Sequence, residues 1–159
     1  MKPHLHIALT VFALLAAGPT LAARNAHEHG HDATAATLQL NAGQKWETDA
    51  PLRAGMAEIR QTMTASLHAI HANKMSAQAY DRLAKKVSTS VGKIVANCKL
   101  PPAADDQLHI VIADLLAGAD HMAGKVKGAR RMDGAVKVID ALDAYGQHFN
   151  DPDFQPIEH

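Results

Sequence analysis

Four stretches of the chain place apolar residues three or four positions apart, and each stretch ends near proline, glycine or asparagine. In the first stretch these positions are Leu52, Met56, Ile59, Met63, Leu67 and Ile70. Such spacing puts apolar side chains on one face of a helix, whereas no stretch alternates for long enough to predict a strand. Four amphipathic helices of about 20 residues with short loops predict an all-α fold. We expect an antiparallel up-down-up-down four-helix bundle over residues 48–150.

Two of the four stretches begin at residues that commonly cap helices. Asp49 stands just before Pro51 at the start of the first stretch, and Ser76 opens the second. The side chain of each can accept a hydrogen bond from an unpaired N–H of the first helical turn, where proline is also tolerated. We therefore expect helices to start directly after Asp49 and Ser76.

Residues 1–23 have the pattern of a secretion signal. Lys2 precedes an apolar run that is too short to span a bilayer, and small residues follow at Ala22-Ala23, where a signal peptidase would cut. We expect export to a bacterial periplasm and no membrane span after cleavage. Residues 24–47 are polar and lack a helical period, so they predict a flexible arm. Residues 151–159 form the expected C-terminal tail.

Three histidines stand close together in the expected arm, at His27, His29 and His31. Neutral imidazoles bind zinc, copper and nickel, and short histidine-rich segments can capture such ions. The alternative is an incidental polar linker. A flexible arm does not set a rigid coordination geometry by itself, so a defined site would need help from the folded domain.

Composition limits the classes of function. Removal of the signal leaves about 135 residues, enough for one domain with a core. The 16 basic and 16 acidic residues balance, and the basic ones are dispersed apart from short pairs such as Lys85-Lys86. This distribution argues against a nucleic-acid partner. The sequence lacks the motifs for covalent haem, di-iron sites, phosphate-binding loops and metal-dependent or serine hydrolases, so we expect no enzymatic activity.

Cys98 is the only cysteine of the chain. A lone thiol cannot form an internal disulfide in an oxidising compartment. It is therefore buried as a small apolar side chain, bound to a metal, or paired with a second molecule, which would make a homodimer.

An antiparallel bundle would bring four possible metal ligands to one end. The start of the first helix, the end of the second, the start of the third and the end of the fourth share that end, which places Met56, Cys98, His109 and His148 at similar depth. A thioether, a thiol and two imidazoles suit copper(I), with copper(II) or zinc as further choices. Met56 and Cys98 lie on the apolar faces, whereas His109 and His148 flank theirs. The alternative is that these residues are ordinary core and surface side chains.

The architecture resembles the exported four-helix bundles of the cytochrome b562 and cytochrome c′ class. In the b562-type proteins a methionine early in the first helix and a histidine late in the fourth hold a non-covalent haem b. Met56 matches the methionine position of this family, and His148 is the candidate for the second haem ligand after a local rearrangement. The family's histidine follows a tyrosine directly, whereas Tyr145 precedes Gly146 here, and His148 comes two residues later. Gly146 also predicts a gap that a ligand or Trp46 could fill.

The segments from Leu40 to Met56 and from Asn97 to Pro101 resemble uncharacterised exported proteins associated with metal resistance. The export signal, the possible bundle-end ligands and the histidines of the arm support the leading hypothesis, which does not depend on this second resemblance. It is a periplasmic protein that binds a transition metal, copper before others, for sequestration, delivery or sensing. The alternatives are a b-type haem electron-transfer protein and a metal-free helical adaptor that binds a periplasmic protein partner.

Overall fold

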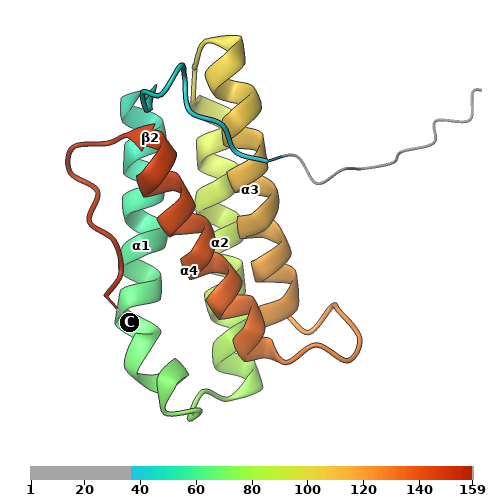
Figure 1. Ribbon diagram of the computed structural model, residues 1–159. Helices are drawn as coiled ribbons and strands as arrows, with labels where there is room; N and C mark the ends of the chain where they lie inside the picture. Colours follow the sequence, from blue (N-terminus) through green and yellow to red (C-terminus); the bar gives the residue numbers. More distant parts are fainter. Residues whose placement is uncertain (1–36, 159) are drawn as a thin grey trace, which may run out of the picture. The chain divides into compact units, whose positions relative to one another are not determined.

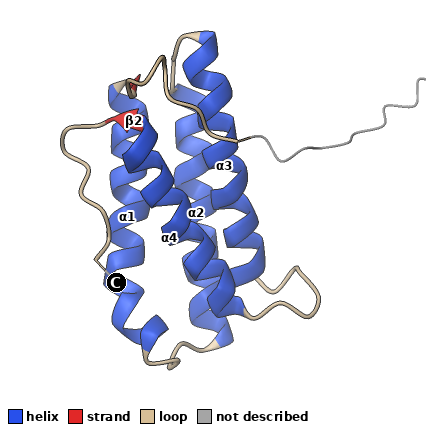
Figure 2. Ribbon diagram, viewed as in Figure 1, coloured by secondary structure: helices blue, strands red, loops and turns tan. Residues whose placement is uncertain are grey.

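Within residues 37–158 the protein is all-α, with four helices and two very short strands (Figures 1 and 2). The computed structural model describes residues 37–158. The expected signal peptide and His27, His29 and His31 lie outside the described residues. The helices are α1 (Ala50–His71), α2 (Ala77–Asn97), α3 (Pro102–Met122) and α4 (Arg131–His148).

Both caps expected from the sequence are confirmed. The Asp49 side chain accepts a hydrogen bond of 2.9 Å from the N–H of Leu52 at the start of α1, with Pro51 in the first turn. The Ser76 hydroxyl accepts one of 3.2 Å from the N–H of Ala79 at the start of α2. These bonds satisfy N–H groups that have no partner within the helix, so the helix boundaries are set locally.

The core is built from the predicted apolar faces of the four helices. Each helix packs against the next along the chain, and α3 and α4 approach each other closely over the most extensive of these contacts. Gly118 of α3 and Gly134 of α4 explain this approach, because a Cβ atom on Gly134 would lie only 2.5 Å from the carbonyl oxygen of Gly118. A further contact joins α1 to α4, and it is less extensive than the three contacts between successive helices.

A short parallel strand pair joins the segment before α1 to the segment after α4. Strand β1 (Trp46–Glu47) pairs with β2 (Phe149–Asn150), and Trp46 lies opposite Phe149. The sequence predicted no strand, and that expectation is wrong at these residues. Two-residue strands are too short for a period of two to show, and their pairing follows from the chain entering and leaving neighbouring helices.

The C-terminal tail packs on the end of α4. The Tyr145 ring is stacked on Phe149, with centroids 5.2 Å apart, and meets the edge of Phe154 at 5.1 Å. Phe154 also covers Gly146, where an added Cβ atom would come within 3.0 Å of its ring. The space predicted beside Gly146 is therefore filled by the tail, and Trp46 lies on the strand pair.

No helix within residues 37–158 is long and apolar enough to cross a membrane.

Candidate functional site: the Asp49–Cys98 contact

The end of α2 is held against the start of α1 by Asp49. One carboxylate oxygen of Asp49 accepts the hydrogen bond from Leu52, and the other accepts a bond of 2.6 Å from the N–H of Lys99. The thiol of Cys98, directly after α2, lies close enough to this carboxylate for each group to shift the pKa of the other. A single side chain therefore caps α1, holds the chain after α2 and contacts the only thiol of the protein.

Burial and charge keep the Cys98 thiol protonated at neutral pH. Partial burial is the main cause, and the negative charge of Asp49 adds to it, so the pKa of Cys98 rises to about 11. For Asp49, burial alone would raise the pKa. The hydrogen bonds from Lys99 and Leu52, with the neighbouring Cys98 thiol and the charge of Arg53, outweigh burial and lower the pKa of Asp49 below its ordinary value. The pair is thus a neutral thiol beside a carboxylate anion.

The other ligands expected from the sequence lie in different environments. Met56 is fully buried in the core. His109 is exposed on α3, with 65% of its side chain accessible, and its Nδ1 lies 2.9 Å from the carbonyl oxygen of Asp105. His148 is partly buried on α4, and its Nδ1 lies 2.8 Å from the carbonyl oxygen of Ala144. This assigns the proton of each neutral ring to Nδ1 and leaves Nε2 as the atom able to bind a metal.

The structure does not gather these residues into one ligand set. Within residues 37–158 no three His, Cys, Asp or Glu side chains are placed so that they could hold a metal ion together. Cys98, His109 and His148 therefore do not form such a group. The physical reason is orientation, because His109 faces solvent on α3 and the charged group that acts most strongly on Cys98 is the carboxylate of Asp49. The sequence indicated Asp49 as a helix cap only, although its place at the same bundle end as Cys98 was a signal for this contact.

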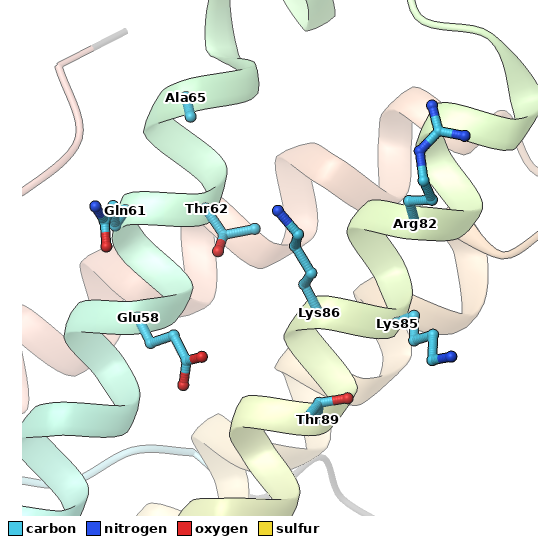
Figure 3. A pocket seen from close by; sticks show the side chains of 8 residues that line it. All are labelled: Glu58, Gln61, Thr62, Ala65, Arg82, Lys85, Lys86 and Thr89. Atoms are coloured by element: carbon cyan, nitrogen blue, oxygen red, sulfur yellow. The ribbon is translucent and has the colours of Figure 1, made fainter.

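A second feature was missed by the sequence analysis. A groove of about 640 Å³ runs between α1 and α2, and Arg82, Lys85 and Lys86 line its α2 side (Figure 3). We call it the basic groove. In the sequence, Lys85-Lys86 stands out only as a short pair among dispersed basic residues. The spacing of Arg82 from both lysines, three and four residues along a helix, was the signal that all three share one face.

Comparisons with protein-family models, with curated proteins and with solved structures found no match to this chain. The resemblance to the cytochrome b562 class thus remains a prediction from the sequence.

Proposed function

We propose that this protein is an exported helical protein that binds a transition-metal ion, copper before others, and that it is not an enzyme. The observation that supports this proposal best is the contact between the Cys98 thiol and the Asp49 carboxylate at a partly exposed end of the helices. A thiolate is a soft donor that favours copper(I). The role would be sequestration, delivery or sensing in the periplasm.

Metal binding at Cys98 requires loss of the thiol proton, since the thiolate is the ligand. The raised pKa of Cys98 makes this loss costly at neutral pH, and copper(I) must displace the proton. The displaced proton passes to solvent water, because the lowered pKa of Asp49 keeps its carboxylate ionised beside the thiol. Uptake of copper(I) would then depend on pH.

The histidines have separate roles in this proposal. His27, His29 and His31 capture ions from solution, and the free Nε2 atoms of His109 and His148 bind weakly and independently. The fully buried Met56 could reach a metal only if core packing around it opened. A haem held by Met56 and His148 would need the same opening, and Phe154 already fills the space beside Gly146. We therefore rank haem b below copper.

The proposal includes the antiparallel arrangement expected from the sequence. Two ion pairs between successive helices support it, from Lys93 of α2 to Glu58 of α1 at 2.9 Å and from Lys137 of α4 to Asp114 of α3 at 3.0 Å. The hydrogen bond from Lys99 to Asp49 adds a third link, between the end of α2 and the start of α1. Antiparallel neighbours joined by short loops produce links of this kind.

An anaerobic copper(I) titration against a chromophoric competitor tests the proposal. The chain from residue 24 onward would be compared with Cys98→Ser and with a variant in which His27, His29 and His31 are alanine. We expect the Cys98 variant to lose about tenfold or more in affinity at the tightest site, and the histidine variant to lose only weaker sites. Met63→Leu is the control variant that should not change copper(I) affinity, because Met63, like Met56, is a fully buried methionine of α1.

Two outcomes would contradict the proposal. Unchanged affinity in Cys98→Ser would exclude the thiol as a ligand. Absence of copper binding by the wild-type chain would leave a metal-free helical protein that acts through a partner. An absorbance spectrum recorded with added haemin separates the remaining alternative, because a Soret band lost in Met56→Leu but kept in Met63→Leu would assign haem to Met56.

A further inference from the structure

The basic groove is formed by matching faces of two helices. On α2 its lining residues are Arg82, Lys85, Lys86 and Thr89, spaced by three, four and seven positions from Arg82. The lining positions on α1, from Glu58 to Ala65, repeat the same spacing. Residues spaced in this way lie on one face of a helix, so the groove follows the seam between α1 and α2 (Figure 3).

The three cations of the groove have no partner in the described part of the chain. Arg82, Lys85 and Lys86 form no ion pair and no side-chain hydrogen bond there. The one acidic residue in the lining, Glu58, is already bound to Lys93, with both carboxylate oxygens 2.9 Å from the ammonium nitrogen. This hydrogen bond is the main cause of the lowered pKa of Glu58.

Unpaired like charges at this spacing destabilise a helix, so the cluster is unfavourable unless an anion binds it. Elsewhere in residues 37–158, Arg130, Arg131 and Lys137 each pair with an aspartate, whereas single exposed cations such as Lys74 and Lys127 form no ion pair. The groove therefore carries a local excess of positive charge that the described residues do not neutralise.

Neutral donors stand beside the cations. The Lys86 side chain extends from α2 toward α1, where Thr62 lies, and Thr89 lies on α2 one turn from Lys86 (Figure 3). A phosphate group carries several strong acceptor oxygens, and charge-assisted hydrogen bonds from lysine and arginine are the strong ones for such a group. Ammonium, guanidinium and hydroxyl groups around one groove suit a phosphate better than a single carboxylate.

The groove also has room for an uncharged part of a ligand. A second hollow of about 280 Å³ shares Thr62, Arg82 and Lys86 with it and extends to Met75 and Leu83 near the turn between α1 and α2. Met75 is partly buried against the core. A molecule with its phosphate between Arg82 and Lys86 could place an apolar part against Met75.

We propose that the basic groove binds a small molecule that carries a phosphate or diphosphate group. Such a site is independent of the Asp49–Cys98 contact, which lies at the start of α1 and the end of α2. A phosphate on a lipid headgroup has the same chemistry, but the concave seam between two helices favours a small molecule that enters it.

The test is a titration of ¹⁵N-labelled, metal-free protein with sodium pyrophosphate, followed by NMR. We expect shifts concentrated at residues 58–66 and 82–89, weaker at higher salt because the ions screen the charges. The double variant Arg82→Gln/Lys86→Gln should bind about tenfold or more weakly. Lys127→Gln is the control, as Lys127 is an exposed cation outside the groove without an ion pair in the described region, and its affinity should stay within about twofold.

A gain of binding provides a second check that loss of folding cannot imitate. Glu58→Gln removes the only acidic side chain of the lining and frees Lys93, so pyrophosphate should bind about threefold or more tightly. Shifts outside the groove, equal effects of the double variant and Lys127→Gln, or equal binding of acetate and pyrophosphate would overturn the proposal. So would sedimentation with phosphatidylglycerol vesicles in the absence of pyrophosphate binding, which would assign the cations to a membrane surface.

Discussion

The hydroxyl of Tyr145 donates a hydrogen bond of 2.8 Å to a carboxylate oxygen of Asp151. Tyr145 is fully buried on α4, whereas Asp151 belongs to the tail that follows β2. The same ring packs against Phe149 and Phe154. This bond therefore fixes the tail to the end of α4 and places Phe154 over Gly146.

Removal of the Tyr145 hydroxyl should destabilise the protein, whereas removal of the Tyr80 hydroxyl should not. Tyr145→Phe loses the bond to Asp151, and we expect the free energy of unfolding to fall by about 1 kcal/mol. The hydroxyl of Tyr80 is buried without a hydrogen-bond partner in the described structure. Tyr80→Phe removes an unsatisfied polar group and should leave stability unchanged or raise it. Urea unfolding of both variants measures the difference, and equal losses would contradict the role assigned to Asp151.

Asp49 should make folding stability depend on pH in the acid range. Its pKa is lowered in the folded state, so the unfolded state binds a proton more readily. The stabilisation is complete above the ordinary pKa of an aspartate and is lost as the pH falls through the lowered folded value. Asp49→Asn keeps a capping side chain but has no charge to titrate.

Urea unfolding at a series of pH values between neutral and strongly acidic would test this. The loss of stability on acidification should be smaller in Asp49→Asn than in the wild type. Glu58 and Asp133, whose pKa values are also lowered, contribute to both proteins equally. Parallel curves for the two proteins would show that Asp49 has no such effect.

Cys98 should react slowly with alkylating agents near neutral pH. The thiolate is the reactive form, and burial together with the charge of Asp49 raises the pKa of Cys98 to about 11. We expect the rate with iodoacetamide to rise steeply up to that pH. At pH 8 the folded protein should react about tenfold or more slowly than the urea-unfolded protein.

The Asp49→Asn variant isolates the electrostatic part of this effect. Without the carboxylate charge the pKa of Cys98 should fall, because a nearby negative charge disfavours the thiolate. Alkylation at pH 8 should therefore become about several-fold faster. An unchanged rate would mean that burial alone controls the thiol.

Features set by local sequence were predictable, and features set by the rotation of a helix were not. Asp49 and Ser76 cap the helices as expected because a cap needs only residues within one turn. Cys98 and Asp49 were predictable as residues of one bundle end, but the contact between them depends on the path of Lys99 after α2. The exposure of His109 follows from the rotation of α3, which residues on the flank of an apolar face do not define.

The C-terminal tail lay outside the reach of periodicity. Phe154 follows Pro152 in a segment without helical or strand spacing, yet its ring determines what lies beside Gly146. The unpaired cations of the basic groove were hidden for a different reason. Glu58 of α1 pairs with Lys93 of α2, so it does not neutralise the cations of the groove. The sequence of a single helix does not show which residues pair between two helices.

The close approach of α3 and α4 yields the last prediction. A Cβ atom at position 134 would lie 2.5 Å from the Gly118 carbonyl oxygen and 2.6 Å from the Met122 nitrogen. Both are backbone atoms, which cannot move aside as a flexible side chain can. Gly134→Ala should therefore force the helices apart and lower the free energy of unfolding by about 1–3 kcal/mol.

Gly92→Ala is the matched control on α2, where an added Cβ atom meets nothing within 4 Å. There the only effect is the better helix propensity of alanine, so stability should rise by up to about 1 kcal/mol. Thermal unfolding followed by circular dichroism would compare the two variants. Because intrinsic propensity favours alanine at both positions, opposite signs can arise only from packing between α3 and α4. A stabilising Gly134→Ala would mean that the two helices separate without cost.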